Sequence, residues 1–224
     1  MSGESFSIQV QDGVEVTAIR NVPDGGTLKG LLVYAPGAGS NINDPFGAYL
    51  SRRLVDSSYC SVRFQFPYME AGRRRPDSLR LLEEVWVQVI TAAAVEGVPL
   101  VVGGRSMGGR IASLVVAQGA VVDGLALFAY PLHPPGRSIA LSGAWRGEHF
   151  SSIAVPTLFC SGTRDTFATR EDLLEAASMV PGSQVHILDG ADHGFAVLKS
   201  SGRDREDVWT EATDRLLEWL AGLT

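Results

Sequence analysis

The sequence predicts an α/β protein with a mostly parallel central sheet of about eight strands, flanked by helices. Short apolar segments, such as residues 29–35 and 98–103, alternate with longer segments whose apolar residues recur at helical spacing. Strands that are apolar throughout are typical of a parallel sheet with helices on both faces. The length of 224 residues, without a linker-like stretch, predicts one domain spanning residues 1–224.

The elements are expected in a regular order. Residues 6–20 alternate apolar and polar around Asp12-Gly13, which predicts an antiparallel hairpin. Pro76-Asp77 and Gly119 mark a helix start and a helix end. Further strands are expected at 29–35, 60–66, 98–103, 124–130, 155–161 and 184–188, and helices at 46–56, 77–95, 106–118, 169–179 and 204–221.

Composition and charge exclude several classes of protein. The formal net charge of −6 argues against a general nucleic-acid binder, which needs a basic surface. No apolar run is long enough to span a bilayer, and the N-terminus lacks the pattern of a signal peptide. We therefore expect a cytoplasmic protein with no membrane partner, present as a monomer or a homodimer.

Two cysteines, Cys60 and Cys160, lie in strand-like runs and are expected to be buried free thiols. Neither the cysteines nor the four histidines show the spacing of metal ligands. The sequence therefore predicts no metal site and no cofactor.

A single serine stands among glycines where a predicted strand meets a predicted helix. Residues 104–108, Gly-Arg-Ser-Met-Gly, match the G-x-S-x-G pattern of a nucleophile elbow. The sharp turn exposes the serine hydroxyl and leaves room only for small residues on either side. Ser106 is therefore the candidate nucleophile, and the alternative is an ordinary helix N-cap.

A serine nucleophile needs a general base and an acid that orients the base. Asp165 follows the strand that ends near Ser161, and His193 lies in the loop after the strand at 184–188. Both positions are at the carboxyl ends of parallel strands, where open α/β sheets place their sites. Asp189 and Asp192 flank the histidine, but a sequence neighbour seldom reaches round to orient the ring, so Asp165 is preferred.

The other three histidines are weaker candidates for the base. His186 lies inside a predicted strand, and His149 precedes a strand, at the wrong end of the sheet. His133 follows a strand at the catalytic end, so it is either a loop residue or a residue that lines the pocket.

Backbone donors for an oxyanion hole are expected from two places. The amide of Met107 directly follows the nucleophile, and the small-residue turn after residue 35 brings the amide of Ala38, or next that of Gly39, close to it.

Substrate contacts are expected from side chains that leave strands at the same end of the sheet. The candidates are Tyr68, Met69, His133 and Phe195. Arg73–Arg75 form either a solvated loop or a site that attracts an acidic substrate, and a structural salt bridge is favoured for Arg105. Only about two dozen residues, 132–154, separate two predicted strands where a lid is commonly inserted. A minimal lid, or none, and an open pocket are therefore expected.

Several motifs together resemble a known superfamily. They are YAPGAGSN, FPYMEAGRRRPD, GGRSMGGRIAS, YPLHPPG, RGEHF, PTLFCSGTRDTF and DGADHGF, and they cover most of residues 31–195. They resemble the small α/β-hydrolase-fold proteins near the dienelactone hydrolases, in particular the testis-expressed/NSL-complex-subunit type of predicted hydrolases. The resemblance implies an α/β-hydrolase fold and a Ser-His-Asp site at Ser106, His193 and Asp165. Relatives commonly carry His-Gly before the oxyanion loop, where this chain has Pro36-Gly37.

The sequence thus predicts a cofactor-independent, carboxylesterase-like serine hydrolase whose partner is a small-molecule ester or thioester. The alternative is a catalytically silent α/β-hydrolase-fold interaction module, because a fold by itself does not guarantee the chemistry. Turnover of a simple short-chain ester distinguishes the two.

Overall fold

The computed structural model describes residues 3–11, 13–25, 27–135 and 144–223. An eight-stranded sheet forms its centre, with the strand order β1-β2-β4-β3-β5-β6-β7-β8. The strands are β1 (Glu4–Gln11), β2 (Val14–Asn21), β3 (Leu31–Ala35), β4 (Cys60–Phe64), β5 (Leu100–Arg105), β6 (Gly124–Phe128), β7 (Thr157–Gly162) and β8 (Gln184–Leu188). The β1–β2 and β2–β4 pairs are antiparallel and all others are parallel. The predicted fold class is confirmed.

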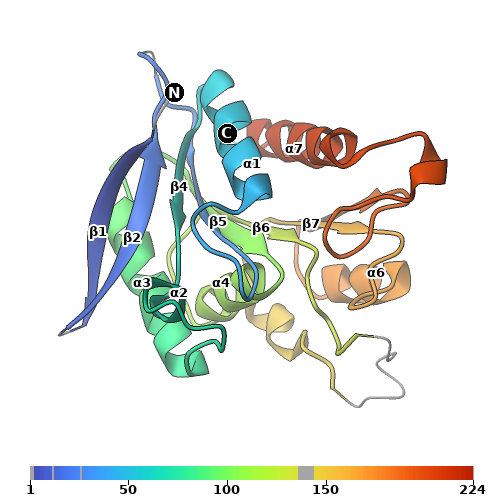
Figure 1. Ribbon diagram of the computed structural model, residues 1–224, viewed down its shortest axis with the longest axis horizontal. Coiled ribbons are helices and arrows are strands. Elements are labelled where there is room, and N and C mark those ends of the chain that lie inside the picture. The colour runs from blue at the N-terminus through green and yellow to red at the C-terminus, as the bar shows by residue number, and fades with distance from the viewer. Residues whose placement is uncertain (1–2, 12, 26, 136–143, 224) are drawn as a thin grey trace.

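Helices cover both faces of this sheet (Figure 1). One face carries α1 (Pro45–Asp56) and α7 (Arg205–Ala221), and the other carries α3 (Leu79–Ala93), α4 (Met107–Ala117) and α6 (Arg170–Ser178). Side chains of β3 alternate between the two cores: Leu31 and Val33 pack towards α3 and α4, whereas Leu32 and Tyr34 pack towards α1 and α7. Burial on both faces is the reason that the central strands are apolar at every position.

Local signals explain where several helices begin. Asp44 caps α1 by accepting a hydrogen bond from the Gly47 amide, and Ser78 caps α3. Thr169 and Asp204 start α6 and α7 with capping boxes. Each cap satisfies amides that have no partner inside the helix, so these short sequence signals determine the boundaries.

Three short helices were not predicted: α2 (Pro67–Glu70) and the 3-10 helices η1 (Glu148–Ser152) and η2 (Lys199–Ser201). All three are too short for a periodic pattern to reveal them. Part of the segment at which a lid was considered, residues 136–143, lies outside the described residues.

Both cysteines are buried and free, as predicted. Within the described part of the chain, no helix combines the length and the apolar character needed to span a bilayer.

Candidate active site

The turn from β5 into α4 holds Ser106 in a left-handed backbone conformation, with φ 51° and ψ −117°. The Ser106 amide donates a hydrogen bond to the Phe128 carbonyl oxygen on β6 (2.9 Å), which ties the turn to the sheet. Gly104 and Gly108 lie against the backbone of Ala35, since a Cβ at either position would be 2.2 Å from the Ala35 oxygen. The glycines are therefore required by this close packing, and the serine side chain is left facing outward.

The three predicted side chains meet at the carboxyl ends of β5, β7 and β8. The Ser106 Oγ lies 2.9 Å from His193 Nε2, and His193 Nδ1 lies 3.0 and 2.9 Å from the two oxygens of the Asp165 carboxylate. With the proton on Nδ1, the ring donates to Asp165 and accepts from the serine hydroxyl. The geometry is that of a nucleophile, a base and an orienting acid.

Further contacts hold the side chains of Asp165 and His193 in place. The Asp165 side chain is completely buried, and it accepts hydrogen bonds from the Ser161 hydroxyl and the Phe167 amide, both at 2.9 Å. The Phe167 ring packs against the imidazole of His193, with ring centroids 4.1 Å apart. These contacts leave the carboxylate with a fixed orientation towards His193.

The loop after β3 brings backbone amides close to the nucleophile. A Cβ on Gly37 would lie 3.5 Å from the Cβ of Ser106, so the two backbones are neighbours. The amides of Ala38 and Met107 donate to no acceptor among the described residues, and both residues line the cavity beside Ser106. Two unengaged donors at this position have the arrangement of an oxyanion hole.

A cavity of about 510 Å³ opens beside Ser106. Its lining consists of the loop after β3, the turn from β5 into α4, and residues from the loops after β6, β7 and β8. These residues are Gly37, Ala38, Arg105, Ser106, Met107, Arg110, Pro131, Arg146, Phe167, His193 and Gly194.

A family model described as an alpha/beta hydrolase domain matches residues 28–221. The chain belongs to the alpha/beta hydrolase family. The superfamily inferred from the motifs is thereby confirmed. A comparison with curated proteins gave no match.

Solved structures of other α/β hydrolases share the fold over nearly the whole chain. Est1E from Butyrivibrio proteoclasticus superposes with a TM-score of 0.74 at 15% identity, covering 98% of this chain and 100% of its own. A dienelactone hydrolase from Anabaena variabilis gives 0.71 at 16% identity, covering 99% of each chain. An α/β serine hydrolase homologue from Coxiella burnetii gives 0.71 at 20% identity, covering 97% of each chain. At these identities the likeness establishes the fold alone.

Within this α/β hydrolase, the Gly39 amide does not point its hydrogen at the cavity. It donates to the hydroxyl of Tyr68 at 3.1 Å, and Tyr68 is fully buried on α2. The candidate oxyanion donors are therefore Met107 and Ala38 rather than Gly39. The Tyr68 hydroxyl therefore supplies a contact that holds the loop after Pro36.

Tyr68→Phe is expected to lower kcat about 10-fold while KM stays within about twofold, because the loop that carries the Ala38 amide loses its anchor. The measurement is steady-state hydrolysis of p-nitrophenyl acetate, with thermal unfolding recorded on the same preparations. Tyr59→Phe is the matched control, since Tyr59 is a buried tyrosine outside the cavity lining. An unchanged kcat in Tyr68→Phe would show that the Tyr68 hydroxyl is not needed to position the loop that carries the Ala38 amide.

The structure corrects the four predicted substrate contacts, none of which lines the cavity. Tyr68 is turned into the core as described, and Met69 packs beside it against the same core. Phe195 is buried against Phe46 on the α1 face, with ring centroids 5.2 Å apart. His133 is buried, with Nδ1 2.8 Å from the Pro134 oxygen and Nε2 3.2 Å from Asp172 on α6. All four residues follow strands at their carboxyl ends, as predicted. Their side chains pack elsewhere and do not reach the cavity.

The remaining two histidines have partners away from the nucleophile. His186 on β8 lies 2.8 Å from Glu211 of α7. His149 on η1 lies 2.7 Å from the Ser113 hydroxyl on α4, and burial, followed by the charge of Arg110, lowers its pKa to about 4. His149 is therefore neutral near pH 7.

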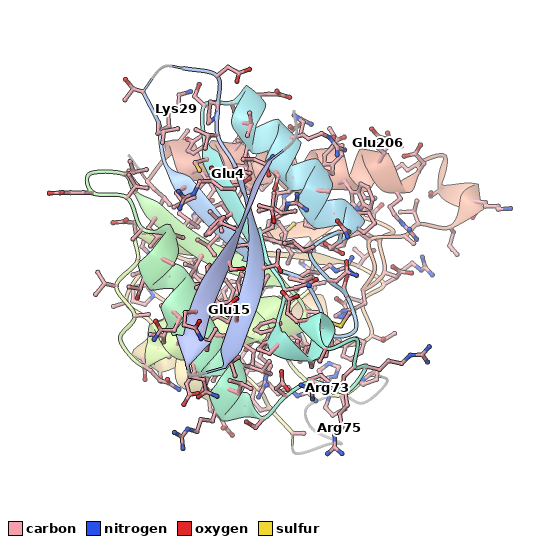
Figure 2. All side chains as sticks on the ribbon, turned by 60° about the vertical axis from the view of Figure 1, so that its left-hand side comes forward. Glu4, Glu15, Lys29, Arg73, Arg75 and Glu206 are labelled. Carbon is pink, nitrogen blue, oxygen red and sulfur yellow. The ribbon has the colours of Figure 1, made fainter. Side chains whose placement is uncertain are left out.

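Arg73 and Arg75 lie on the exposed loop between α2 and α3, and Arg75 points away from the body of the molecule (Figure 2). Arg73 pairs with Asp77 at 2.6 Å, and none of Arg73–Arg75 lines the cavity. Arg105 forms the expected structural ion pair, with Asp44 at 3.3 Å.

Sequence reasoning missed Arg110, Arg146 and Phe167 at the cavity. Arg110 had a usable signal, since it lies four residues after Ser106 and therefore on the same helix face. Arg146 and Phe167 lie in irregular segments, where spacing carries no information about direction.

Proposed function

We propose that this chain is a serine hydrolase that cleaves a small carboxylic ester or thioester without a cofactor. The observation that carries the proposal is the continuous hydrogen-bonded chain from Ser106 Oγ through His193 to Asp165, with distances of 2.9 to 3.0 Å. Ser106 has a positive φ, and its hydroxyl faces a histidine that is paired with a buried carboxylate. Its side chain makes no capping hydrogen bond, so these features support a nucleophile rather than a helix cap.

The mechanism follows from these contacts. The Ser106 oxygen attacks the ester carbonyl carbon while His193 Nε2 takes the hydroxyl proton. Asp165 keeps the Nδ1 proton in place and stabilises the imidazolium that forms. The amides of Ala38 and Met107 stabilise the negative charge on the carbonyl oxygen. His193 then protonates the leaving group, and water, activated by the same histidine, releases the acid from Ser106.

A fluorophosphonate probe, followed by mass spectrometry of the labelled peptide, tests this function directly. The expected adduct is on Ser106, because an activated serine hydroxyl attacks phosphorus as it attacks a carbonyl carbon. Absence of labelling, together with no turnover of p-nitrophenyl acetate, would favour the interaction-module alternative.

We further propose a preference for short acyl groups. Each buried methylene contributes roughly 0.8 kcal/mol, so a deep apolar pocket would make kcat/KM climb steadily with chain length. The cavity wall carries three arginines, and Ala38 and Gly194 at the cavity are exposed, so the far end of a long acyl tail would remain in contact with water. We expect the highest kcat/KM for acetyl to butyryl esters and no further increase for octanoyl esters. We also expect no interfacial activation.

The measurement is kcat/KM for p-nitrophenyl esters of two to twelve carbons, below their micelle-forming concentrations. A steady rise through the decanoyl ester would contradict the preference for short acyl groups.

A further inference from the structure

The cavity beside Ser106 is strongly cationic for a site that acts on a neutral ester. Three arginines, Arg105, Arg110 and Arg146, contribute to its lining. Asp165 is engaged by His193 and contributes no free negative charge to the cavity. Each arginine therefore needs either a carboxylate partner in the protein or an anion from elsewhere.

The charge of Arg105 is accounted for within the fold. Its Nη2 lies 3.3 Å from the Asp44 carboxylate, which also accepts hydrogen bonds from the Tyr34 hydroxyl (2.7 Å) and the Gly47 amide (2.9 Å). Arg105 thus belongs to the network that begins α1.

Arg110 has no such partner. It lies one helical turn after Ser106 on α4, and its Nε is buried without a hydrogen-bond acceptor. It takes part in no ion pair with any described residue. Two of its neighbours are uncharged near pH 7: burial raises the pKa of Tyr130, and burial followed by the charge of Arg110 lowers that of His149.

Arg146 is close to Arg110 and is likewise without a carboxylate among the described residues. Burial, and next the charge of Arg110, lowers the pKa of Arg146. Its backbone is held firmly, because its amide donates to the Leu132 oxygen (2.9 Å) and its carbonyl oxygen accepts from the Tyr130 hydroxyl (3.1 Å). The preceding segment, residues 136–143, contains neither Asp nor Glu in its sequence.

Two neighbouring guanidinium groups repel each other and are costly to desolvate, and a ligand with negatively charged oxygens offsets both effects. We propose that Arg110 and Arg146 form an anion subsite in the Ser106 cavity. The preferred substrate is then a small ester or thioester that carries a second, ionised group, a carboxylate or a phosphate. The inference has a binding half, the anion subsite, and a catalytic half, the substrate class. The catalytic half rests on the proposed hydrolase function, whereas the binding half does not.

The binding half is tested on the Ser106→Ala protein, in which no turnover interferes. Isothermal titration with glutarate and with inorganic phosphate is expected to show saturable binding of at least one of them, and the neutral diamide glutaramide is expected not to bind. Arg110→Gln and Arg146→Gln in this background should each weaken the binding about 10- to 100-fold, as expected when a charge-assisted hydrogen bond is lost. Arg75→Gln, on an exposed loop outside the cavity, is the control and should bind as before.

Absence of saturable binding of either anion to folded protein would overturn the subsite. Equal affinity in the parent and in both arginine variants would also overturn it. Arg110→Lys is included because a lysine retains the charge but not the planar fork, so partial binding is expected if Arg110 contacts the anion. Thermal unfolding of every variant confirms that the protein tested is folded.

The catalytic half is tested with monomethyl and dimethyl glutarate, which differ by one ionised group. The wild-type protein should show a kcat/KM at least about 10-fold higher for the monoester, and each arginine-to-glutamine change should bring the ratio of the two kcat/KM values close to one. Equal rates for the two esters, unchanged in both variants, would overturn the substrate class but leave the hydrolase intact. Binding of glutarate by a protein that neither turns over p-nitrophenyl acetate nor takes the fluorophosphonate label would instead reject the hydrolase and keep the subsite.

Discussion

Ser106→Ala is expected to lower kcat for p-nitrophenyl acetate by roughly 10³- to 10⁶-fold and to abolish labelling by a fluorophosphonate probe. The hydroxyl removed is the one that lies 2.9 Å from His193 Nε2. The change takes away one oxygen and makes no new contact, so the folded structure should persist. Residual turnover would come from the backbone amides of Ala38 and Met107, which the substitution leaves in place.

His193→Gln should cause a comparable loss, roughly 10³-fold or more, because glutamine cannot accept the proton. His186→Gln is the matched control. His186 also faces a carboxylate, Glu211 at 2.8 Å, but it lies outside the cavity lining. Its replacement should leave kcat within about twofold, since this partly exposed pair is remote from the nucleophile. Robust labelling that persists in Ser106→Ala, or equal losses in the two histidine variants, would contradict the assigned roles.

Gly108→Ala is expected to cause a large loss of stability, about 3 kcal/mol or more. A Cβ at this position would lie 2.2 Å from the Ala35 oxygen and 2.6 Å from the Pro36 oxygen. Both atoms belong to the backbone that leads into the oxyanion loop, so neither can move aside like a flexible side chain. The elbow and the loop would have to separate, and activity should fall together with stability.

The measurement is urea unfolding, with kcat/KM recorded on protein that remains folded. Gly222→Ala at the end of α7 is the control. Its nearest neighbour would be the Trp219 oxygen at 3.4 Å and its φ is −90°, so an alanine fits there. If the free energy of unfolding of Gly108→Ala lay within about 0.5 kcal/mol of that of Gly222→Ala, the prediction would be wrong. The close approach of Gly108 to Ala35 and Pro36 would then not be needed for stability.

Local patterns in the sequence predicted most of the helices and strands. The apolar run at 98–103 became β5, Leu100–Arg105, and the segment at 77–95 became α3, Leu79–Ala93. These boundaries depend on neighbours in the sequence, such as the Ser78 cap and the glycines after β5, so the sequence alone reveals them. The helix α2 has four residues, which are too few to show a periodic pattern in the sequence. Its presence is understood only from its contact with the loop after β3.

The sequence by itself determined which end of the sheet carries the site and which three residues meet there. In a parallel sheet the carboxyl ends of β5, β7 and β8 lie at one edge, so the order Ser106, Asp165, His193 implies their proximity. The catalytic roles of these three residues remain predictions that the variants above test.

Only the tertiary structure decided what surrounds those residues. Tyr68 and His133 were expected to contact substrate, but each is itself buried and hydrogen-bonded elsewhere, to the Gly39 amide and to Asp172 respectively. Arg110 and Arg146 are separated by 36 positions in the sequence, and they line the same cavity because η1, which follows Arg146, packs against α4. A side chain's direction depends on the packing of segments far apart in the chain, and no local pattern encodes that packing.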